Sequence, residues 1–202
     1  MAGREGRVLS DFEYDYWGDC TNTFDEERKH YIYAQCMGLT AGSVNRGLAI
    51  HNHTILLSGK RILDVGGGPV SMLLKCSGLQ EGLVWDPLEY PDWTVDRYRT
   101  KHIHVVRKPA EELDETGWDE VWMYNCLQHT EDPAKVIANC MKAGKVFRIF
   151  EWIDIPPHDG HPQMLTRPLL DKWIGQEGKI GLFDNVMGCT GRAYFGAFVT
   201  GN

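Results

Sequence analysis

A glycine-rich segment with two nearby acids has the residue types and the spacing to bind a nucleoside. The segment Asp64-Val65-Gly66-Gly67-Gly68-Pro69-Val70-Ser71 lies where a β-rich run ends and a helix is predicted to begin. Glycines at such a bend let the backbone and a ligand approach to contact distance. Asp86 follows Gly66 by twenty residues, at the end of the next predicted strand. A carboxylate at that position can accept hydrogen bonds from both hydroxyls of a ribose.

The acid that opens this segment distinguishes two kinds of nucleoside ligand. A nicotinamide dinucleotide sets its pyrophosphate against a helix N-terminus and favours the pattern G-x-G-x-x-G, but the sixth position here is Ser71. S-adenosylmethionine has no phosphate and carries an ammonium and a sulfonium, so Asp64 favours it by Coulomb attraction. An NAD(P)-dependent oxidoreductase is the alternative enzyme. A protein that binds S-adenosylmethionine without catalysis is a third hypothesis.

Residues 60–200 resemble the class I S-adenosylmethionine-dependent methyltransferases, and the glycine segment resembles their motif I. The resemblance implies a Rossmann-like, seven-stranded sheet whose last strand is antiparallel. It also implies that Asp64 and Gly66, Gly67 and Gly68 surround the methionine part of the cofactor. Asp86 would then bind the ribose, with its neighbour Pro87 also contacting the cofactor.

Two later segments extend the resemblance. Ala110-Glu111-Glu112-Leu113 resembles the acidic segment that holds the adenine. The family often has Asp where this chain has Pro109, so the backbone of Ala110 and the side chain of Glu111 are the candidate contacts. Asn125-Cys126-Leu127-Gln128-His129 resembles the small-molecule branch of the family, in which this stretch lies beside the reactive methyl group. The resemblance therefore implies that Asn125 and Cys126 contact the cofactor and that the acceptor is a small molecule.

Three histidines are candidates for the chemistry. Methyl transfer is an in-line displacement that needs chiefly alignment and the exclusion of water, although a neutral His can act as a base. His129 is the first candidate because it follows the fourth predicted strand; its alternative role is a structural one at a helix entrance. His158 and His161 lie in a Pro- and Gly-rich loop after the fifth strand, where they either face the site or are solvated. Glu151 and Asp154 are expected to make the rim beside them acidic.

Aromatic residues near the N-terminus are candidates for substrate binding. Tyr16 and Trp17 precede the first predicted helix and could stack on a flat or cationic acceptor. Packing of this arm on the edge of the sheet is the alternative. Cys126 lacks the Pro-Cys context of carbon-methylating enzymes that use a Cys nucleophile, which favours a small buried residue at this position.

The elements that must position these residues alternate between strands and helices. The pattern predicts a helix over 24–38, where Thr23 to Glu26 form a capping box, and a second helix over 69–75. The predicted strands are 61–65, 83–86, 102–106, 120–124, 146–153, 179–183 and 193–200, and two further helices are predicted over 132–141 and 165–174. Such alternation predicts an α/β fold, a doubly wound and mostly parallel sheet with helices on both faces. The last two strands could form a hairpin at one edge.

Length and composition limit the remaining choices. At 202 residues the chain is expected to form a single domain, with an arm and a capping helix over 1–45 and a cofactor-binding core over 60–202. The net charge of -7 argues against nucleic acid as a partner. We expect no metal site, and the six scattered cysteines are expected to be reduced thiols. No membrane span or signal peptide is recognised, so a cytoplasmic monomer or homodimer is expected.

Overall fold

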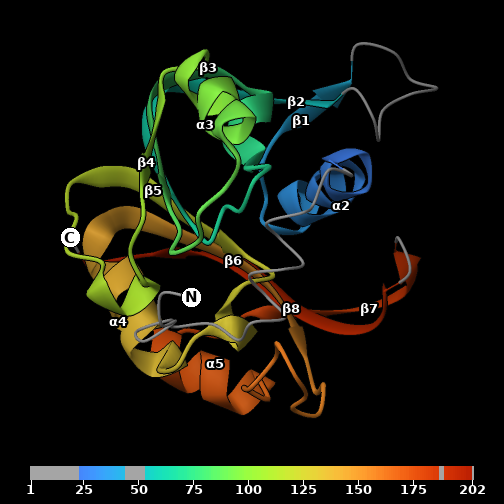
Figure 1. The fold of residues 1–202 in the computed structure, drawn as a ribbon. Helices are drawn as coiled ribbons and strands as arrows, with labels where there is room; N and C mark the ends of the chain where they lie inside the picture. The colour runs from blue at the N-terminus through green and yellow to red at the C-terminus, as the bar shows by residue number, and fades with distance from the viewer. Residues whose placement is uncertain (1–22, 44–52, 187–188, 202) are drawn as a thin grey trace, which may run out of the picture.

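The computed structural model describes residues 23–43, 53–186 and 189–201 (Figure 1). The α-helices of this part of the chain are α2 (Thr23–Cys36), α3 (Asp92–Arg99), α4 (Pro133–Ala143) and α5 (Arg167–Ile174). The strands are β1 (Ala41–Ser43), β2 (His53–Val65), β3 (Cys76–Trp85), β4 (Ile103–Val106), β5 (Trp118–Tyr124), β6 (Gly144–Ile153), β7 (Lys179–Val186) and β8 (Cys189–Val199). Three short 3-10 helices are η2 (Met72–Lys75), η3 (Ala110–Glu112) and η4 (Leu127–His129).

Seven strands form one sheet in the order β4-β3-β2-β5-β6-β8-β7, and β1 pairs with the start of β2. The pairs among β2, β3, β4, β5 and β6 are parallel, whereas β8 runs antiparallel to both β6 and β7. The predicted mostly parallel sheet with an antiparallel last strand is therefore confirmed, as is the hairpin of the last two strands at one edge. The strand order reverses between β2 and β5, and ligands of doubly wound sheets bind beside such a reversal.

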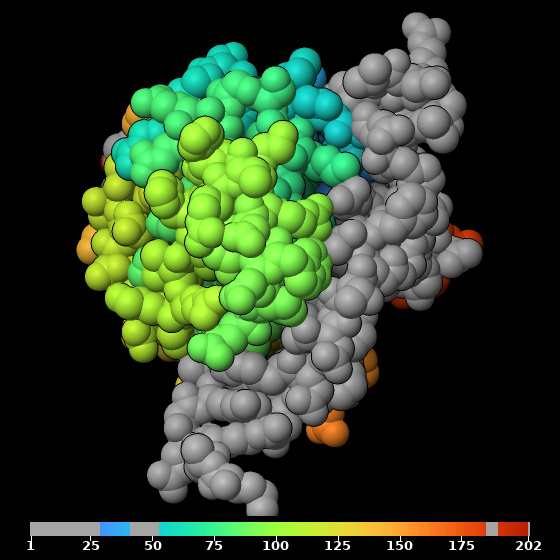
Figure 2. All heavy atoms as spheres, turned by 45° about the horizontal axis from the view of Figure 1, so that its top comes forward, coloured from blue at the N-terminus to red at the C-terminus, as the bar shows by residue number. Residues whose placement is uncertain are grey.

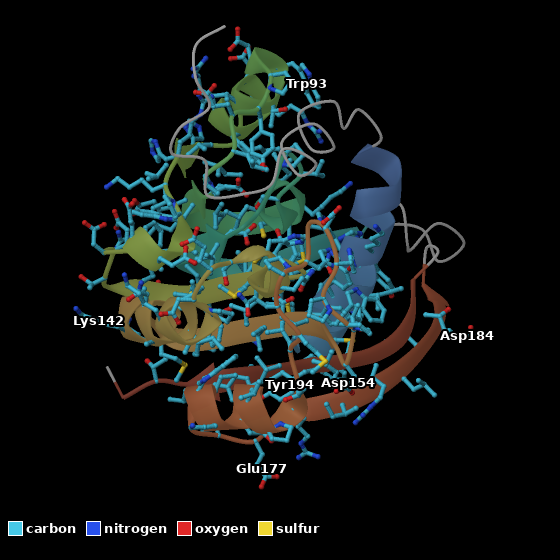
Figure 3. All side chains as sticks on the ribbon, turned by 60° about the horizontal axis from the view of Figure 1, so that its bottom comes forward. Trp93, Lys142, Asp154, Glu177, Asp184 and Tyr194 are labelled. Atoms are coloured by element: carbon cyan, nitrogen blue, oxygen red, sulfur yellow. The ribbon has the colours of Figure 1, made fainter. Side chains whose placement is uncertain are left out.

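Helices cover both faces of the sheet, as predicted (Figure 1). On one face, residues of α4 and α5 such as Val136 and Leu170 join a buried apolar cluster with β5 and β6. Figure 3 labels Tyr194 on β8 near α5, and its hydroxyl donates to Asp171 Oδ1 of that helix (2.9 Å). On the other face, α2, α3 and η2 build a second cluster that contains Tyr33 and Tyr98. Figure 2 shows the side on which the green residues of β3, α3 and β4 come forward.

The prediction of a helix over 69–75 is wrong. The chain forms only η2 and then enters β3 at Cys76, which pairs with Ile55. Ser71 has extended backbone angles, and its hydroxyl accepts from Leu73 N (3.0 Å), so helical structure begins only at Met72. This short connection between β2 and β3 is stabilised by side-chain hydrogen bonds such as that of Ser71, and not by a longer helix.

Two features of the described chain go beyond the sequence prediction. Strands β2 and β3 extend toward their N-termini, so the sheet already includes residues before 60. Helix α3 was not predicted because it is largely polar and buries only Thr94 and Tyr98. No helix in the described ranges is both long and apolar enough to cross a membrane. The division of the chain into a capping segment and a core stays a prediction, and residues 1–22 lie outside the described part.

Candidate functional site

A pocket lies at the carboxyl ends of β2, β3 and β5, beside the reversal of strand order. Its empty volume is about 900 Å³, which includes the open solvent at its mouth. Most of the predicted cofactor residues line it. These are Gly66, Gly67, Gly68, Asp86, Pro87, Ala110, Glu111, Asn125 and Cys126, together with the predicted catalytic residue His129.

The three glycines of the loop have different steric surroundings. A Cβ on Gly66 would lie 2.5 Å from Cys126 Sγ, and one on Gly67 would lie 2.7 Å from Asp64 Oδ2. A Cβ on Gly68 would meet no atom within 4 Å, although its φ of +64° favours glycine. Gly66 and Gly67 therefore permit close internal packing, and Gly68 leaves open space at the pocket.

Asp64 stabilises the glycine segment through hydrogen bonds but does not itself line the pocket. The carboxylate is fully buried, and its Oδ2 accepts from Ser71 Oγ (2.5 Å) and from the hydroxyl of Tyr124 (2.5 Å). Its Oδ1 has no hydrogen-bond partner among the described residues. Burial raises the pKa of Asp64 to about 7, against the opposing effect of the two hydrogen bonds. The ionised form of Asp64 would stabilise a positive charge placed nearby, and its Oδ1 could accept a further hydrogen bond.

Two tyrosine hydroxyls fix the backbone of the same loop. The hydroxyl of Tyr98, from α3, donates to Gly68 O (2.5 Å) and accepts from Ser71 N (2.9 Å). The hydroxyl of Tyr124 accepts from Met72 N (2.9 Å) in addition to donating to Asp64. Sequence reasoning missed both tyrosines, because each is far from the loop in the chain and belongs to a different element.

Asp86 lies in the pocket wall and is almost fully buried. Its Oδ2 accepts from Gly68 N (3.0 Å), and its Oδ1 accepts from Leu88 N (3.0 Å) and from the hydroxyl of Tyr90 (2.9 Å). Burial raises its pKa. A carboxylate offers about four acceptor positions. One position on Oδ2 thus remains for a ligand, and rotation of the Tyr90 hydroxyl would free another on Oδ1.

The predicted adenine segment forms η3 at the end of β4. Pro109 O accepts from Trp85 Nε1 (2.9 Å), which ties this segment to β3. The side chain of Asn139 in α4 donates to Ala110 O (3.3 Å). Glu111 Oε1 accepts from Glu131 N (2.9 Å), so this carboxylate connects η3 to the segment that precedes α4.

The segment after β5 is held by a buried acid. Glu151 Oε1 accepts from the backbone N–H groups of Cys126 and Leu127 (both 3.0 Å), and burial raises the pKa of Glu151 to about 7. Asn125 adopts a φ of +52°, an uncommon conformation for a residue other than glycine. The expectation that Glu151 belongs to an acidic rim is wrong, because it is 0% exposed. Asp154 is exposed and pairs with Arg192 (2.7 Å).

His129 lines the pocket, whereas His158 and His161 do not. His129 Nδ1 is 2.5 Å from Gly160 O, and its Nε2 is 3.3 Å from Gln128 Nε2. A carbonyl only accepts, so Nδ1 carries the proton, and the lone pair of Nε2 accepts from the side-chain amide of Gln128. The ring of His161 packs edge-on against His129 with centroids 4.5 Å apart, and His158 packs on His161 at 4.3 Å. Neither lines the pocket, and a direct catalytic role for them stays a prediction.

Helix α2 contributes His30 and Tyr33 to the pocket wall. Sequence reasoning expected a capping helix here but did not single out these two side chains, whose spacing of three residues places them on one helix face. The predicted substrate-binding residues Tyr16 and Trp17 lie outside the described residues. In the same described part of the chain, no three His, Cys, Asp or Glu side chains group as metal ligands, and Cys36, Cys76, Cys126 and Cys140 are free thiols.

Comparison with known proteins identifies the fold. No protein-family model matches the sequence, and no curated protein matches it. Among solved structures, the chain is similar to one from a complex between the Haloferax volcanii Trm112 methyltransferase activator and a protein described as a methyltransferase (TM-score 0.67, 12% identity, 97% of this chain and 100% of that one). It is also similar to a SAM-dependent methyltransferase from Aquifex aeolicus (TM-score 0.59, 14% identity, 95% and 100%). A third is a SAM-dependent methyltransferase of Thermotoga maritima, described as a possible histamine N-methyltransferase (TM-score 0.58, 12% identity, 92% and 98%).

These similarities extend over nearly the whole chain, but the sequence identities are low. They establish the arrangement of strands and helices and leave the reaction to be argued from the site. The strand order, the antiparallel last strand and the pocket at the reversal of strand order agree with this result. The chain therefore has the fold of the class I S-adenosylmethionine-dependent methyltransferases.

Proposed function

We propose that this chain binds S-adenosylmethionine in the pocket and transfers its methyl group to a small molecule. The observation that carries the proposal is the pairing of Gly68 with Asp86. The glycine leaves open space at the pocket, and the buried acid beside it has room for hydrogen bonds from a ligand. When bound, S-adenosylmethionine supplies a methyl group on a positively charged sulfur.

The residues of the pocket fit the parts of this cofactor. Asp86 would accept hydrogen bonds from the ribose hydroxyls, with one acceptor position on Oδ2 and another gained when the Tyr90 hydroxyl rotates away. The backbone of Ala110 and the side chain of Glu111 would lie against the adenine. Gly66, Gly67 and Gly68 would pass close to the methionine part, because the loop carries no side chains there.

Asp64 supports the binding of a cation in two ways. It holds the loop in place through Ser71 and Tyr124, and it sets a carboxylate directly beneath Gly67. The buried acid has a raised pKa in the ligand-free chain, so part of it is protonated near neutral pH. A nearby positive charge favours the ionised form. Binding of a cation is therefore coupled to the loss of a proton from Asp64.

His129 is the residue that can take a proton from the acceptor. Its Nδ1–H donates to Gly160 O, which fixes the neutral tautomer with the lone pair on Nε2. The ring is further held by the side chain of His161. His129 would accept a proton at Nε2, in place of the hydrogen bond from Gln128, when the attacking atom is a hydroxyl oxygen, and it would orient the acceptor when that atom needs no base.

Calorimetric titration with S-adenosylhomocysteine, the demethylated product, tests the proposed cofactor. The informative pair of variants is Asp86→Asn and Asp171→Asn. Both aspartates accept hydrogen bonds through Oδ1 from a backbone N–H and a tyrosine hydroxyl, but only Asp86 lines the pocket. Each hydrogen bond to a charged group contributes about 1.5–3 kcal/mol, so Asp86→Asn should weaken binding at least about tenfold. Asp171→Asn should retain the wild-type affinity.

Two further measurements separate the proposed activity from its alternatives. Titration with NAD should show no binding, and incubation with methyl-labelled S-adenosylmethionine and a metabolite extract should give a labelled small molecule. Binding of NAD in place of S-adenosylhomocysteine would support the oxidoreductase. Tight binding without any labelled product would support a protein that binds the nucleoside without catalysis.

A further inference from the structure

The pocket extends beyond the residues assigned to the cofactor. Asp86, Ala110 and Glu111 lie at the ends of β3 and β4, on one side of the glycine loop. On the other side, His30 and Tyr33 of α2 line the same pocket together with Tyr124 at the end of β5. This second end adjoins the segment after β5 that carries His129. None of the contacts proposed above for the cofactor involves His30, Tyr33 or Tyr124.

Three rings form the wall at this end. The ring centroids of His30 and Tyr124 are 5.3 Å apart with an edge-on arrangement. Tyr33 lies 6.2 Å from His30 and 6.1 Å from Tyr124. All three side chains are buried, with exposed fractions of 5% or less. Aromatic rings at these distances form a rigid apolar surface against which another ring can pack edge-on or offset.

His30 places a polar imidazole in this wall. It is 4% exposed, and its Nδ1 has no hydrogen-bond partner among the described residues. Burial lowers the pKa of His30 to about 3, so the ring is neutral and carries one donor and one acceptor nitrogen. A buried polar nitrogen without a partner costs free energy. A ligand that supplies a hydrogen bond to this ring recovers that cost.

The charges around the pocket limit the ligand further. Among the described residues that line it, the charged side chains are the acids Asp86 and Glu111, and no Lys or Arg is present. The carboxyl groups of Asp64 and Glu151 are buried beside the pocket, and burial raises the pKa of each to about 7, so each is only partly ionised near neutral pH. At the end lined by His30, Tyr33 and Tyr124, the described residues offer no cationic side chain to an anionic group of the acceptor, which is unfavourable where water is excluded.

We propose that His30 binds the methyl acceptor and that the acceptor is an aromatic molecule with a hydroxyl or ring N–H group and no anionic group. The three rings pack against its ring, and the imidazole of His30 forms the hydrogen bond that orients it. This inference rests on the proposed function, because it assigns the acceptor to the space left beside the cofactor. His30 acts here as a residue that determines specificity.

Binding of simple ring compounds to the protein saturated with S-adenosylhomocysteine tests this proposal. The probes are phenol, toluene and benzoate, measured by ligand-observed NMR titration against wild type and the His30→Phe variant. We expect phenol to bind wild type at least about fivefold more tightly than toluene, and more tightly than benzoate. The preference for phenol over toluene should disappear in His30→Phe, because phenylalanine keeps a ring but cannot form the hydrogen bond. His53→Phe is the control, since His53 is also a buried histidine (2% exposed) but does not line the pocket.

The outcomes separate this proposal from the proposed function. If S-adenosylhomocysteine binds both variants as it binds wild type, the cofactor site is intact and the ring-compound data concern the acceptor end alone. Benzoate binding as tightly as phenol, a phenol preference that persists in His30→Phe, or no binding of any probe at millimolar concentration would each overturn the proposal. Failure of S-adenosylhomocysteine to bind wild type would instead refute the proposed function.

Discussion

Substitution of Gly66 by alanine tests how the glycine loop packs. Gly66 has a φ of +72°, and an added Cβ would lie 2.5 Å from Cys126 Sγ and 2.6 Å from Cys126 Cβ. Cys126 cannot easily move away, because Glu151 accepts from its backbone N–H (3.0 Å) and its thiol donates to Val65 O (3.3 Å). The alanine methyl group therefore forces a shift in the loop or in the segment after β5.

The expected loss of stability has two parts. A left-handed backbone costs an L-residue about 1–2 kcal/mol relative to glycine, and overpacking a filled site costs about 1–3 kcal/mol more. Gly66→Ala should therefore lower the free energy of unfolding by about 2–5 kcal/mol. Gly175→Ala is the matched control, because Gly175 has a φ of +76° and an added Cβ would meet no atom within 4 Å. Only the conformational part applies there.

Urea denaturation followed by circular dichroism measures both losses. Gly66→Ala should be less stable than Gly175→Ala by about 1–3 kcal/mol. In a Cys126→Gly background, which removes both clashing atoms, this additional loss should largely disappear, so a double-mutant cycle gives a coupling of similar size. Equal losses for Gly66→Ala and Gly175→Ala, or no coupling with Cys126, would refute the packing described for the loop.

Two further predictions concern groups that support the site, and a third concerns a buried ion pair within the sheet. Asp64 has a folded-state pKa near 7, above its unfolded value of about 4, so the native state holds a proton that the unfolded state has lost, and its stability falls as the pH rises from about 4 to 7. Asparagine has no such proton to lose. The stability of Asp64→Asn relative to wild type should therefore be greater at pH 8 than at pH 4 by on the order of 3 kcal/mol, as measured by thermal unfolding at both pH values. Tyr98→Phe leaves Ser71 N without its acceptor and should cost about 1–3 kcal/mol in urea denaturation, with weaker binding of S-adenosylhomocysteine. Arg148→Met removes the main partner of the buried Glu120 and should cost about 3 kcal/mol, whereas an unchanged unfolding midpoint would show that this ion pair is not required.

The features that the sequence predicted correctly depend on short-range patterns. The runs of apolar residues predicted the strands of the sheet, and glycines next to Asp64 predicted the bend of the loop. Asp86 was found because its distance from the loop along the chain is set by one strand–connection–strand unit. All of these signals lie within about one structural unit, where sequence spacing translates directly into position.

The features that were missed depend on contacts between distant elements. The helix expected after the loop is shortened to η2, because the chain enters β3 at Cys76 and pairs there with β2. Propensity alone cannot show that the chain will join the sheet at this residue. Glu151 is a charged residue, which favours an exposed position on the rim. It is buried because the backbone of the segment after β5 donates two hydrogen bonds to it. Tertiary contacts override the local pattern in both places.

A crystal structure of the complex with S-adenosylhomocysteine tests the central claim most directly. We expect electron density for the nucleoside in the pocket, with the ribose hydroxyls within about 3.2 Å of the Asp86 carboxylate and the methionine part along Gly66 to Gly68. Density for the nucleoside at another surface, or in the pocket with its ribose away from Asp86, would contradict it.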